Sequence, residues 1–355
     1  MIRCVEVDNS QYKEMFLSLP KKLYSEGYLT QDWKTEMQIL NHCHTLSNDF
    51  TIYPYIVLID NDNVVARAIL TVYSDDKSGY VGFFESVQSQ EIVNCLLDKI
   101  KEKAIELGLE KLVGPLDCSF WIKYRFKIDH FDSCYTNEPY NKEYYKELWE
   151  NWGFEVCDKY YSNQLRVPTE EDTQEKCVLR LNSMVEKGYL FRTTTKKSFD
   201  KDLVEIYHLM KDVYSHFSGF KMITEKQFVD MFSGLRMILN FDMVYLAYKD
   251  DKLVGFFIAI PNFEGGLFDI SMFDFIRILN TKNNPKEYIM LYMGANSKHP
   301  GLGGAFAELA KQYLQKHKCS SIGALIHEGN TSGVFYKNLI VDRYNYVLMN
   351  YNLAE

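Results

Sequence analysis

The residues with the clearest chemical use lie in a glycine-rich segment near the end of the chain. An apolar run, 288–293, predicts a strand, and Gly301, Gly303 and Gly304 follow it within a short loop. After the loop, apolar residues recur at helical spacing over 306–314. Glycine lets the backbone approach a ligand closely, and free N–H groups at the start of a helix attract anions. A strand, a glycine loop and a helix in this order favour phosphate binding; an ordinary glycine-rich turn is the alternative.

This segment resembles the loop with which the GNAT superfamily of N-acetyltransferases binds the pyrophosphate of acyl-coenzyme A. That loop is usually written Arg/Gln-x-x-Gly-x-Gly/Ala, and Lys298, Gly301 and Gly303 stand at its defined positions. Lysine in the first position departs from the family pattern, but the loop works mainly through its backbone. The resemblance implies acetyl-CoA as a substrate, in contact with Met293, Gly294, Ala295, Lys298, Gly301, Leu302, Gly303, Gly304, Ala305 and Asn330.

The chain contains this plan of elements twice. In each copy a hairpin is followed by a strand, a long helix, a second strand and a short aromatic helix that leads into a closing strand. Apolar alternation around polar turns predicts the hairpins, and apolar residues at helical spacing predict the long helices. The matching segments are 55–73 and 244–261, 79–87 and 288–296, 90–107 and 303–316, 109–117 and 320–330, and 144–167 and 333–353.

The repeat and the resemblance together predict an α/β protein of two tandem GNAT-like domains, each a mixed, mostly antiparallel twisted sheet flanked by helices. A length of 355 residues also favours two domains. We expect the first domain at 1–168 and the second at 189–355, with a connecting segment at 169–188 in which 177–185 forms a helix. In the first copy only residues 88–90 separate strand from helix, so we expect that copy to be degenerate and to bind no coenzyme.

Two helices are also predicted at the start of the second copy. Residues 189–210 resemble the first strand and first helix of a GNAT domain, and a second helix is expected at about 224–239. Thr224 with Gln227 three residues later fits a capping box for that helix. The resemblance implies that the loop between these helices, around 216–222, shapes the acceptor pocket; local core packing is the alternative.

The resemblance also implies catalytic roles. In the superfamily a bulged strand presents a backbone N–H to the thioester; residues 293–295 match it, and Gly294 suits the bulge. A tyrosine on the next short helix often protonates the departing thiolate, and Tyr336 matches that residue. Asn330 lies one residue closer to it than in the family pattern, and Leu339-Ile340 replace the usual Gly-Phe. Packing in the core is the alternative role of Tyr336.

The expected reaction is transfer of an acetyl group from acetyl-CoA to a primary amine of an acceptor, by direct attack in a ternary complex. It needs a deprotonated amine, a polarised carbonyl and a proton for the thiolate. Glu287 is the general base expected by position, with Glu264, Glu328 or a chain of waters as alternatives. Two other functions stay open: an aminoacyl-tRNA-dependent transferase of the same fold, and a catalytically silent ligand-binding protein. The acceptor and the oligomeric state are left open.

Composition disfavours several other classes. The net charge is −8 and the pI about 5.6, and no basic stripe marks a nucleic-acid surface, so no nucleic-acid partner is expected. No run approaches the ~18 apolar residues of a membrane helix, and the first residues do not resemble a signal peptide. We therefore expect a cytoplasmic protein without membrane contact. Eight cysteines occur without CxxC pairs, and His42-Cys43-His44 lacks a second ligand pair at zinc spacing, so no metal is expected.

Overall fold

The computed structural model describes residues 1–25, 28–214, 220–265 and 272–353. Contacts between Cα atoms divide the chain into two units. Unit 1 contains Met1–Lys159, Glu264–Asp269 and Asn345–Glu355, and unit 2 contains Tyr160–Phe263 and Ile270–Tyr344. Two strands, β7 (Glu155–Leu165) and β13 (Ile340–Asn352), therefore contribute residues to both units.

Unit 1 is built on a sheet whose first strands run antiparallel. These are β1 (Arg3–Glu6), β2 (Thr51–Ile59), β3 (Asn63–Val72) and β4 (Ser78–Ser86), which pair in that order. The next strand, β5 (Lys111–Gly114), is parallel to β4, and residues 349–352 of β13 pair antiparallel with β5. Two short elements complete the unit: η1 (Asp60–Asp62) between β2 and β3, and β6 (Phe126–Lys127), which pairs with β13.

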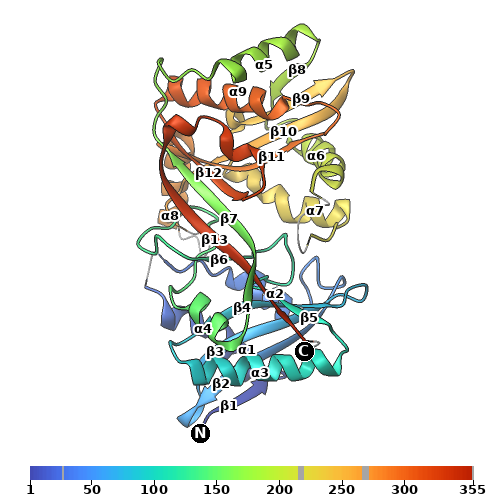
Figure 1. The fold of residues 1–355 in the computed structure, drawn as a ribbon, viewed down its shortest axis with the longest axis vertical. Helices are drawn as coiled ribbons and strands as arrows, with labels where there is room; N and C mark the ends of the chain where they lie inside the picture. Colours follow the sequence, from blue (N-terminus) through green and yellow to red (C-terminus); the bar gives the residue numbers. More distant parts are fainter. Residues whose placement is uncertain (26–27, 215–219, 266–271, 354–355) are drawn as a thin grey trace. The chain divides into compact units, whose positions relative to one another are not determined.

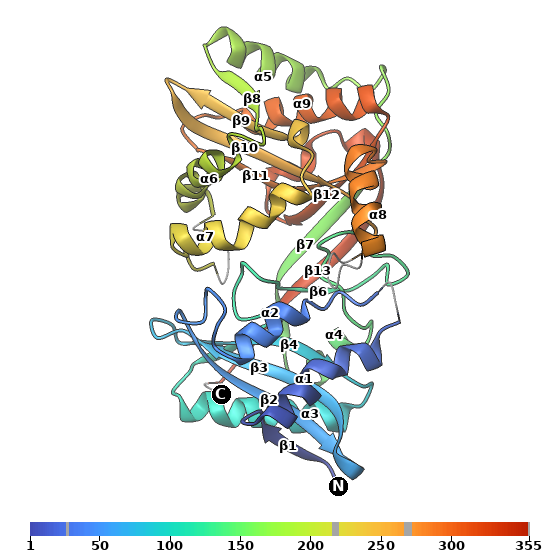
Figure 2. The same ribbon diagram turned by 180° about the vertical axis from the view of Figure 1, so that it is seen from behind.

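Helices cover both faces of this sheet. On one face lie α1 (Ser10–Leu23) and α2 (Trp33–Leu40), and on the other lie α3 (Gln90–Glu106) and α4 (Tyr145–Trp152), as Figures 1 and 2 show from opposite sides. The alternation along β2 explains the two cores. Ile56 and Leu58 pack with α1 and α2, whereas Tyr55 and Val57 pack with α3.

Unit 2 has the same kind of sheet. Its antiparallel strands are β8 (Leu190–Thr193), β9 (Val244–Lys249), β10 (Lys252–Pro261) and β11 (Glu287–Ala295), which pair in that order. The next strand, β12 (Ser320–His327), is parallel to β11, and residues 160–165 of β7 pair antiparallel with β12.

The helices of unit 2 also form two layers. One layer contains α6 (Phe199–Tyr214), which packs on β10 and β11, and α7 (Glu225–Phe232), which packs on α6. The other contains α9 (Leu302–His317), whose apolar face packs on the sheet, and α5 (Glu175–Glu186), which lies along α9 (Figure 1). The remaining elements are η2 (Ser233–Met237), η3 (Phe241–Met243), α8 (Met272–Asn283), η4 (Thr331–Val334) and η5 (Lys337–Leu339).

The two units share one topology, which confirms the predicted duplication and fold class. Unit 1 follows the order β1-α1-α2-β2-β3-β4-α3-β5, and unit 2 follows the order β8-α6-α7-β9-β10-β11-α9-β12. In both, the long helix connects two parallel strands, and every other pairing is antiparallel. The prediction did not include α8, which lies between β10 and β11; only residues 73–77 stand at the matching place in unit 1.

The closing strands differ from the prediction. The sequence predicts that each copy ends in its own closing strand, but residues 160–165, at the end of the first copy, pair with β12 of unit 2. Conversely, residues 349–352, at the end of the second copy, pair with β5 of unit 1. Each closing strand therefore pairs with the sheet of the other unit. Apolar alternation identifies a strand but not its partner, so this exchange of closing strands could not be predicted from the sequence. The ranges 1–168 and 189–355 as folding domains stay a prediction.

Helix ends in unit 2 also differ from those expected. Thr224 caps α7 with both bonds of the predicted capping box, but α7 ends at Phe232 and η2 follows, where the sequence predicts helix as far as residue 239. The short helix expected around Tyr336 is absent; η4 and η5 flank that residue, because its φ of 51° is left-handed. The helix expected at 177–185 is confirmed as α5.

Among the described residues, none of the helices has the length and apolar character that a bilayer crossing needs.

Candidate functional site

The glycine loop joins the end of β11 to the start of α9. The side-chain oxygen of Asn296 accepts a hydrogen bond from the N–H of Lys298 at 3.0 Å, and its carbonyl accepts one from the N–H of His299 at 2.9 Å. Gly301 precedes α9 with a φ of 104°, a conformation that side chains disfavour. The path of the backbone therefore requires glycine at position 301.

The first turn of α9 offers backbone donors to an anion. Helix geometry leaves the N–H groups of Leu302, Gly303 and Gly304 without carbonyl partners inside the helix. The N–H of Ala305 is the first to be used, by the carbonyl of Gly301 at 3.1 Å. The free donors lie at the positive end of a helix of 16 residues, where an anion is favoured. The side chains of Leu302 and Ala305 are buried, so these predicted contact residues offer a ligand only backbone.

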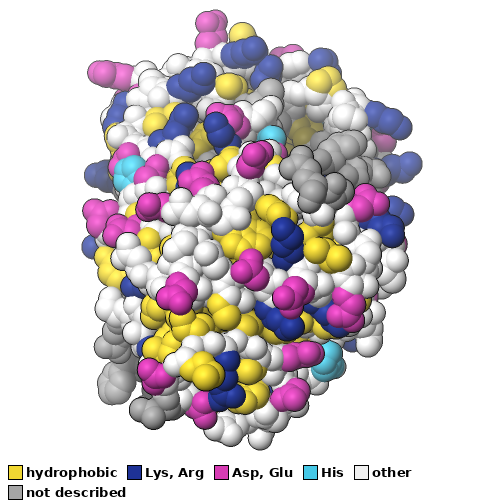
Figure 3. Space-filling model, turned by 60° about the horizontal axis from the view of Figure 1, so that its bottom comes forward, with side chains coloured by type: hydrophobic (Ala, Val, Ile, Leu, Met, Phe, Trp, Pro, Cys, Tyr) yellow, Lys and Arg dark blue, Asp and Glu magenta, His cyan; other side chains and the backbone are white. Residues whose placement is uncertain are grey.

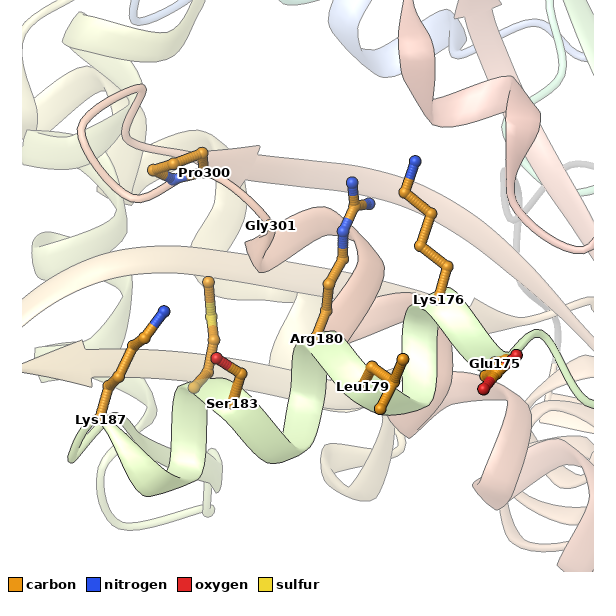
Figure 4. Close-up of a pocket in the computed structure, with 9 residues that line it drawn as sticks. Glu175, Lys176, Leu179, Arg180, Ser183, Lys187, Pro300 and Gly301 are labelled. Carbon is orange, nitrogen blue, oxygen red and sulfur yellow. The ribbon is translucent and has the colours of Figure 1, made fainter.

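A pocket of about 530 Å³ lies between α5 and this loop (Figure 4). Its walls carry three basic side chains, Lys176, Arg180 and Lys187, and one acidic side chain, Glu175. The other lining residues are Leu179, Ser183, Met184, Pro300 and Gly301. Small-molecule sites commonly have volumes of roughly 300–1,000 Å³. The pocket therefore has the size of a ligand site and an excess of positive charge.

The basic groups of this pocket have no acidic partner. Within the part of the chain that the structure describes, the charged groups of Lys176, Arg180 and Lys187 form no ion pair or hydrogen bond. Figure 4 shows Lys176 and Arg180 extending from α5 to the same side. Arg180 lies against α9, because a Cβ atom on Gly304 would be 2.8 Å from the Cδ of Arg180.

None of these three cations is among the site residues predicted from the sequence. Lys176, Arg180 and Lys187 recur at i, i+4 and i+11 in the connecting segment, which is the spacing of one helix face. That pattern is readable from the sequence once the segment is taken as a helix. What the sequence could not indicate is that this helix lies along α9 beside the glycine loop.

The strands β11 and β12 part just before the loop. Their parallel ladder runs only from the pair Glu287–Ser320 to the pair Met290–Gly323. Past this point β12 bends, with a φ of 57° at Leu325, and pairs with β7. Residues 292–295 remain paired with β10, and residues 291–295 form no ladder with β12 among the described residues. The edge of β11 that leads to the glycine loop is therefore open on one side.

A bulge interrupts β11 within this open stretch. The register between β10 and β11 shifts between Ile258 and Ala259, which makes Leu291 the extra residue. The sequence predicts the bulge at Gly294 instead. Glycine is needed at 294 for a different reason, because a Cβ atom there would lie 2.5 Å from the ring of Phe256. The bulge in the structure thus lies three residues closer to the start of β11 than the predicted one.

The corresponding place in unit 1 is filled by the chain itself. After the short parallel ladder, the N–H of Leu116 donates to the carbonyl of Val81 at 2.9 Å. A Cβ atom on Gly82 would lie 2.0 Å from the carbonyl oxygen of Leu116, so the two backbones are in direct contact. The N–H of Phe83 donates to the carboxylate of Asp117 at 2.5 Å. Where β11 and β12 part, the chain after β5 therefore stays joined to β4.

Tyr336, the predicted proton donor, is buried and already paired. Its hydroxyl donates a hydrogen bond to the carboxylate of Glu308 on α9, and its N–H donates to the side chain of Gln174 at 3.0 Å. Burial and, next, the bond to Glu308 raise the pKa of Tyr336 well above its usual value. Phe335 lies closer to the loop, since a Cβ atom on Gly303 would be 3.4 Å from its ring. Proton donation by Tyr336 stays a prediction that competes with a structural role.

Tyr336→Phe separates the two roles. Because Glu308 would lose a buried donor, we expect the free energy of unfolding to fall by about 1–3 kcal/mol with little change in ligand affinity. Tyr207→Phe is the matched control: its hydroxyl donates to the neutral carbonyl of Ile223 at 3.0 Å, so a smaller loss is expected. Thermal unfolding measures both. A wild-type melting temperature with turnover reduced about 10²–10⁴-fold would instead support proton donation.

Glu287, the predicted general base, lies at the far end of β11 from the loop. Its carboxylate accepts hydrogen bonds from Asn262 at 2.7 Å and from Ser320 at 2.9 Å. Eight residue steps separate it from Ala295, a span of about 26 Å along a strand. A base must come within hydrogen-bond reach of the amine, so the role of Glu287 as the general base stays a prediction that these two hydrogen bonds disfavour.

The other predicted residues lie at the surface or outside the described part. Lys298 is exposed on the loop, and Asn330 and Glu328 are exposed in the turn after β12. The N–H of Asn330 donates to the carbonyl of His327 at 2.9 Å. In the expected acceptor loop, 216–219 lie outside the residues that the structure describes.

The fold of each unit is the fold of the GNAT N-acetyltransferases, and the chain carries it twice in tandem. The chain is similar to the solved structure of a tandem GNAT protein from the clavulanic acid biosynthesis pathway, with a TM-score of 0.53 and 10% identity. That similarity covers 100% of this chain and 99% of the other. It is also similar to a probable N-acyltransferase from Enterococcus faecalis V583, with a TM-score of 0.51 and 8% identity over 99% of this chain and 73% of the other.

One curated protein is also similar in sequence. Protein YghO of Escherichia coli (strain K12) is 20% identical over 282 residues, which cover 75% of this chain and 70% of YghO. No protein-family model matches the chain. At these identities the similarities show the fold, and the activity is a separate question.

Proposed function

We propose that this chain is an acyltransferase that moves an acetyl group from acetyl-CoA to a primary amine, at one site in unit 2. The observation that carries the proposal is the parting of β11 and β12 directly before a glycine loop and a helix start. A thioester with a phosphate-bearing tail suits this pair of features, because an open strand edge can bind its chain and free N–H groups can bind its phosphates. In unit 1 the corresponding strands stay joined, which supports one donor per chain.

The residues of the chain would contribute binding and orientation. The N–H groups of Leu302, Gly303 and Gly304 would bind the diphosphate, and Lys298 would add a positive charge beside them. Backbone N–H groups along 291–295 would hydrogen-bond the acyl chain and polarise its carbonyl. In the reaction the carbon–sulfur bond breaks, the amide bond forms, the amine loses a proton and the thiolate gains one. Fixing the two reactants together supplies much of the rate of such a transfer.

An aminoacyl-tRNA donor has less support. A tRNA-binding face needs a continuous basic surface along the nucleic-acid backbone. On the face that Figure 3 shows, acidic and basic side chains are interspersed, and the net charge of the chain is −8. An acyl-CoA needs only a local basic pocket, such as the one lined by Lys176, Arg180 and Lys187.

Calorimetric titration of the whole chain with acetyl-CoA tests the proposal. We expect a single site per chain, and we expect Gly303→Phe to abolish binding, because a bulky side chain against Phe335 and Met293 would fill the space beside the first turn of α9. Gly234→Phe is the matched control, since no atom lies within 4 Å of a Cβ atom at that glycine of the same unit. We expect the control to bind like the wild type.

Three results would contradict the proposal. They are the absence of binding, two equivalent sites per chain, and equal losses in Gly303→Phe and its control. Release of free thiol from acetyl-CoA in the presence of a panel of small amines and peptides then tests the transfer itself. Release that depends on an added amine is the expected result.

A further inference from the structure

We propose that α5, the helix that connects the two copies in sequence, supplies the charged half of the phosphate site, with Arg180 as its central residue. The inference deepens the proposed function and depends on it, because the anion is taken to be the diphosphate of the acyl donor. It assigns donor binding to residues outside the expected second domain, 189–355.

The apolar face of α5 fixes its position along α9. Met184 belongs to the same core cluster as Leu302 and Ala305 of α9, and Leu181 packs against that cluster. Cys177, two turns earlier, packs in the cluster that contains Tyr336. With this face anchored, the adjacent stripe of α5 borders the pocket at residues 300–301; its members are Lys176, Arg180, Ser183 and Lys187.

Arg180 is held over the first turn of α9. A Cβ atom on Gly304 would lie 2.8 Å from the Cδ of Arg180 and 3.1 Å from one of its guanidinium nitrogens. The start of α9 is the positive end of the helix dipole, so a guanidinium there is unfavourable unless a negative charge lies between them. Among the described residues, no carboxylate forms an ion pair or hydrogen bond with Arg180. A bound anion would, because it could accept hydrogen bonds from the helix and from Arg180 together.

The chemistry of the cations indicates a phosphate ester. The planar guanidinium of Arg180 can donate two parallel hydrogen bonds to neighbouring oxygens of one phosphate. Lys176 lies one helical turn away on the same side of α5, and Lys187 also lines the pocket. Three cations around about 530 Å³ suit a ligand with several phosphate groups better than a single carboxylate. The ligand class is therefore a diphosphate ester, and under the proposed function this is the diphosphate of acetyl-CoA.

The first test compares two probes on the whole chain by calorimetry: CoA, which carries the nucleotide, and S-acetylpantetheine, which lacks it. Arg180→Gln is expected to weaken CoA binding by about 10- to 100-fold. The affinity for S-acetylpantetheine should stay unchanged. Lys316→Gln is the matched control, because Lys316 is an exposed lysine in the last turn of α9, about 18 Å from Gly304 along the helix. It loses the same charge and should bind both probes like the wild type.

A double-mutant cycle tests the contact itself. In Gly304→Ala the new methyl group would displace Arg180 from α9, so we expect a loss of CoA affinity similar to that of Arg180→Gln. The double variant should lose little more than either single variant, since both changes remove one interaction. Arg180→Lys, which keeps the charge but not the planar fork, should give an intermediate loss.

The outcomes separate this inference from the proposed function. If the wild type binds CoA and Arg180→Gln binds it equally well, the inference is overturned and the proposed function stands. If Arg180→Gln weakens both probes equally, Arg180 does not bind the phosphates and the inference is also overturned. If the wild type binds neither probe, the proposed function fails first. Melting temperatures of all variants show that they are folded, and a variant that unfolds is replaced by Arg180→Lys in the comparison.

Discussion

Glu36→Gln is expected to lower the free energy of unfolding by about 3–5 kcal/mol, although it changes only one side-chain group. Glu36 on α2 and Arg67 on β3 form a buried ion pair in unit 1, with side-chain exposures of 7% and 2%. The guanidinium donates to the two carboxylate oxygens at 2.7 Å and 2.9 Å. Glutamine keeps the shape but not the charge, so Arg67 would lose its directly bonded carboxylate and keep only the more distant charges of Glu85 and Asp117. Denaturant unfolding at neutral pH measures the loss.

Arg67 also balances other acidic groups, so its removal should cost at least as much. Its guanidinium donates to the carbonyl of Phe16 at 2.9 Å. Burial raises the pKa of both Glu85 and Asp117, and the charge of Arg67 opposes that rise. Arg67→Met would therefore leave the buried carboxylate of Glu36 without its cation, and Glu85 and Asp117 would keep only the charge of Lys123. We expect that variant to be the less stable of the two.

Two controls test whether burial is the cause. Glu102→Gln breaks an exposed ion pair with Lys99 on α3, 3.0 Å long, and should cost less than about 1 kcal/mol. The double variant Glu36→Leu/Arg67→Met removes both charges of the pair and should be more stable than Arg67→Met alone, because it leaves no unpaired carboxylate at position 36. A loss in Glu36→Gln as small as that in Glu102→Gln would show that water reaches the pair.

The helices and strands with strong apolar periodicity could be predicted from the sequence. The residues with which their buried polar side chains form ion pairs could not. The hairpins β2–β3 and β9–β10 and the helices α3 and α9 each repeat apolar residues at one period, so local pattern fixes the element. Arg67 lies inside such an apolar strand, and its partner Glu36 is 31 residues earlier. No spacing rule connects a strand residue to a helix residue across a layer, so the buried ion pair appears only in three dimensions.

The candidate site also has one part that the sequence predicts and another that it does not. The glycine loop is a local feature, since the φ of Gly301 and the free donors of α9 follow from adjacent residues, and the sequence pattern indicates it. Arg180 comes from a helix that precedes the whole second copy, and only the packing of α5 on α9 brings it there. Tyr336 itself has a left-handed backbone conformation and lies between two 3-10 turns where a helix is expected. Its hydroxyl donates to Glu308. The local sequence pattern thus predicts the glycine loop, whereas tertiary packing determines the position of Arg180 and the hydrogen-bond partner of Tyr336.

A fragment of residues 189–355, the second domain expected from the sequence, is predicted not to unfold cooperatively. It lacks residues 160–165 of β7, which pair with β12 from Leu165–Ser321 to Tyr160–His327. It also lacks α5, whose Met184 is buried in the core that α9 forms with the sheet. The fragment would expose one edge of β12 and part of the apolar surface of α9, and an open strand edge favours aggregation.

The matched fragment is 160–344, which keeps β7 from Tyr160 and α5 but omits the last residues of β13. We expect it to show a cooperative thermal transition, because it contains the closing strand that β12 uses in the structure. A fragment of 169–355 restores α5 alone and separates the contribution of the helix from that of the strand. If 189–355 unfolded as cooperatively as 160–344, residues 345–353 would have to close their own sheet in place of β7, as the sequence repeat predicts. The exchange of closing strands would then be a choice between two nearly equivalent pairings, as in domain swapping, and not a requirement of the fold.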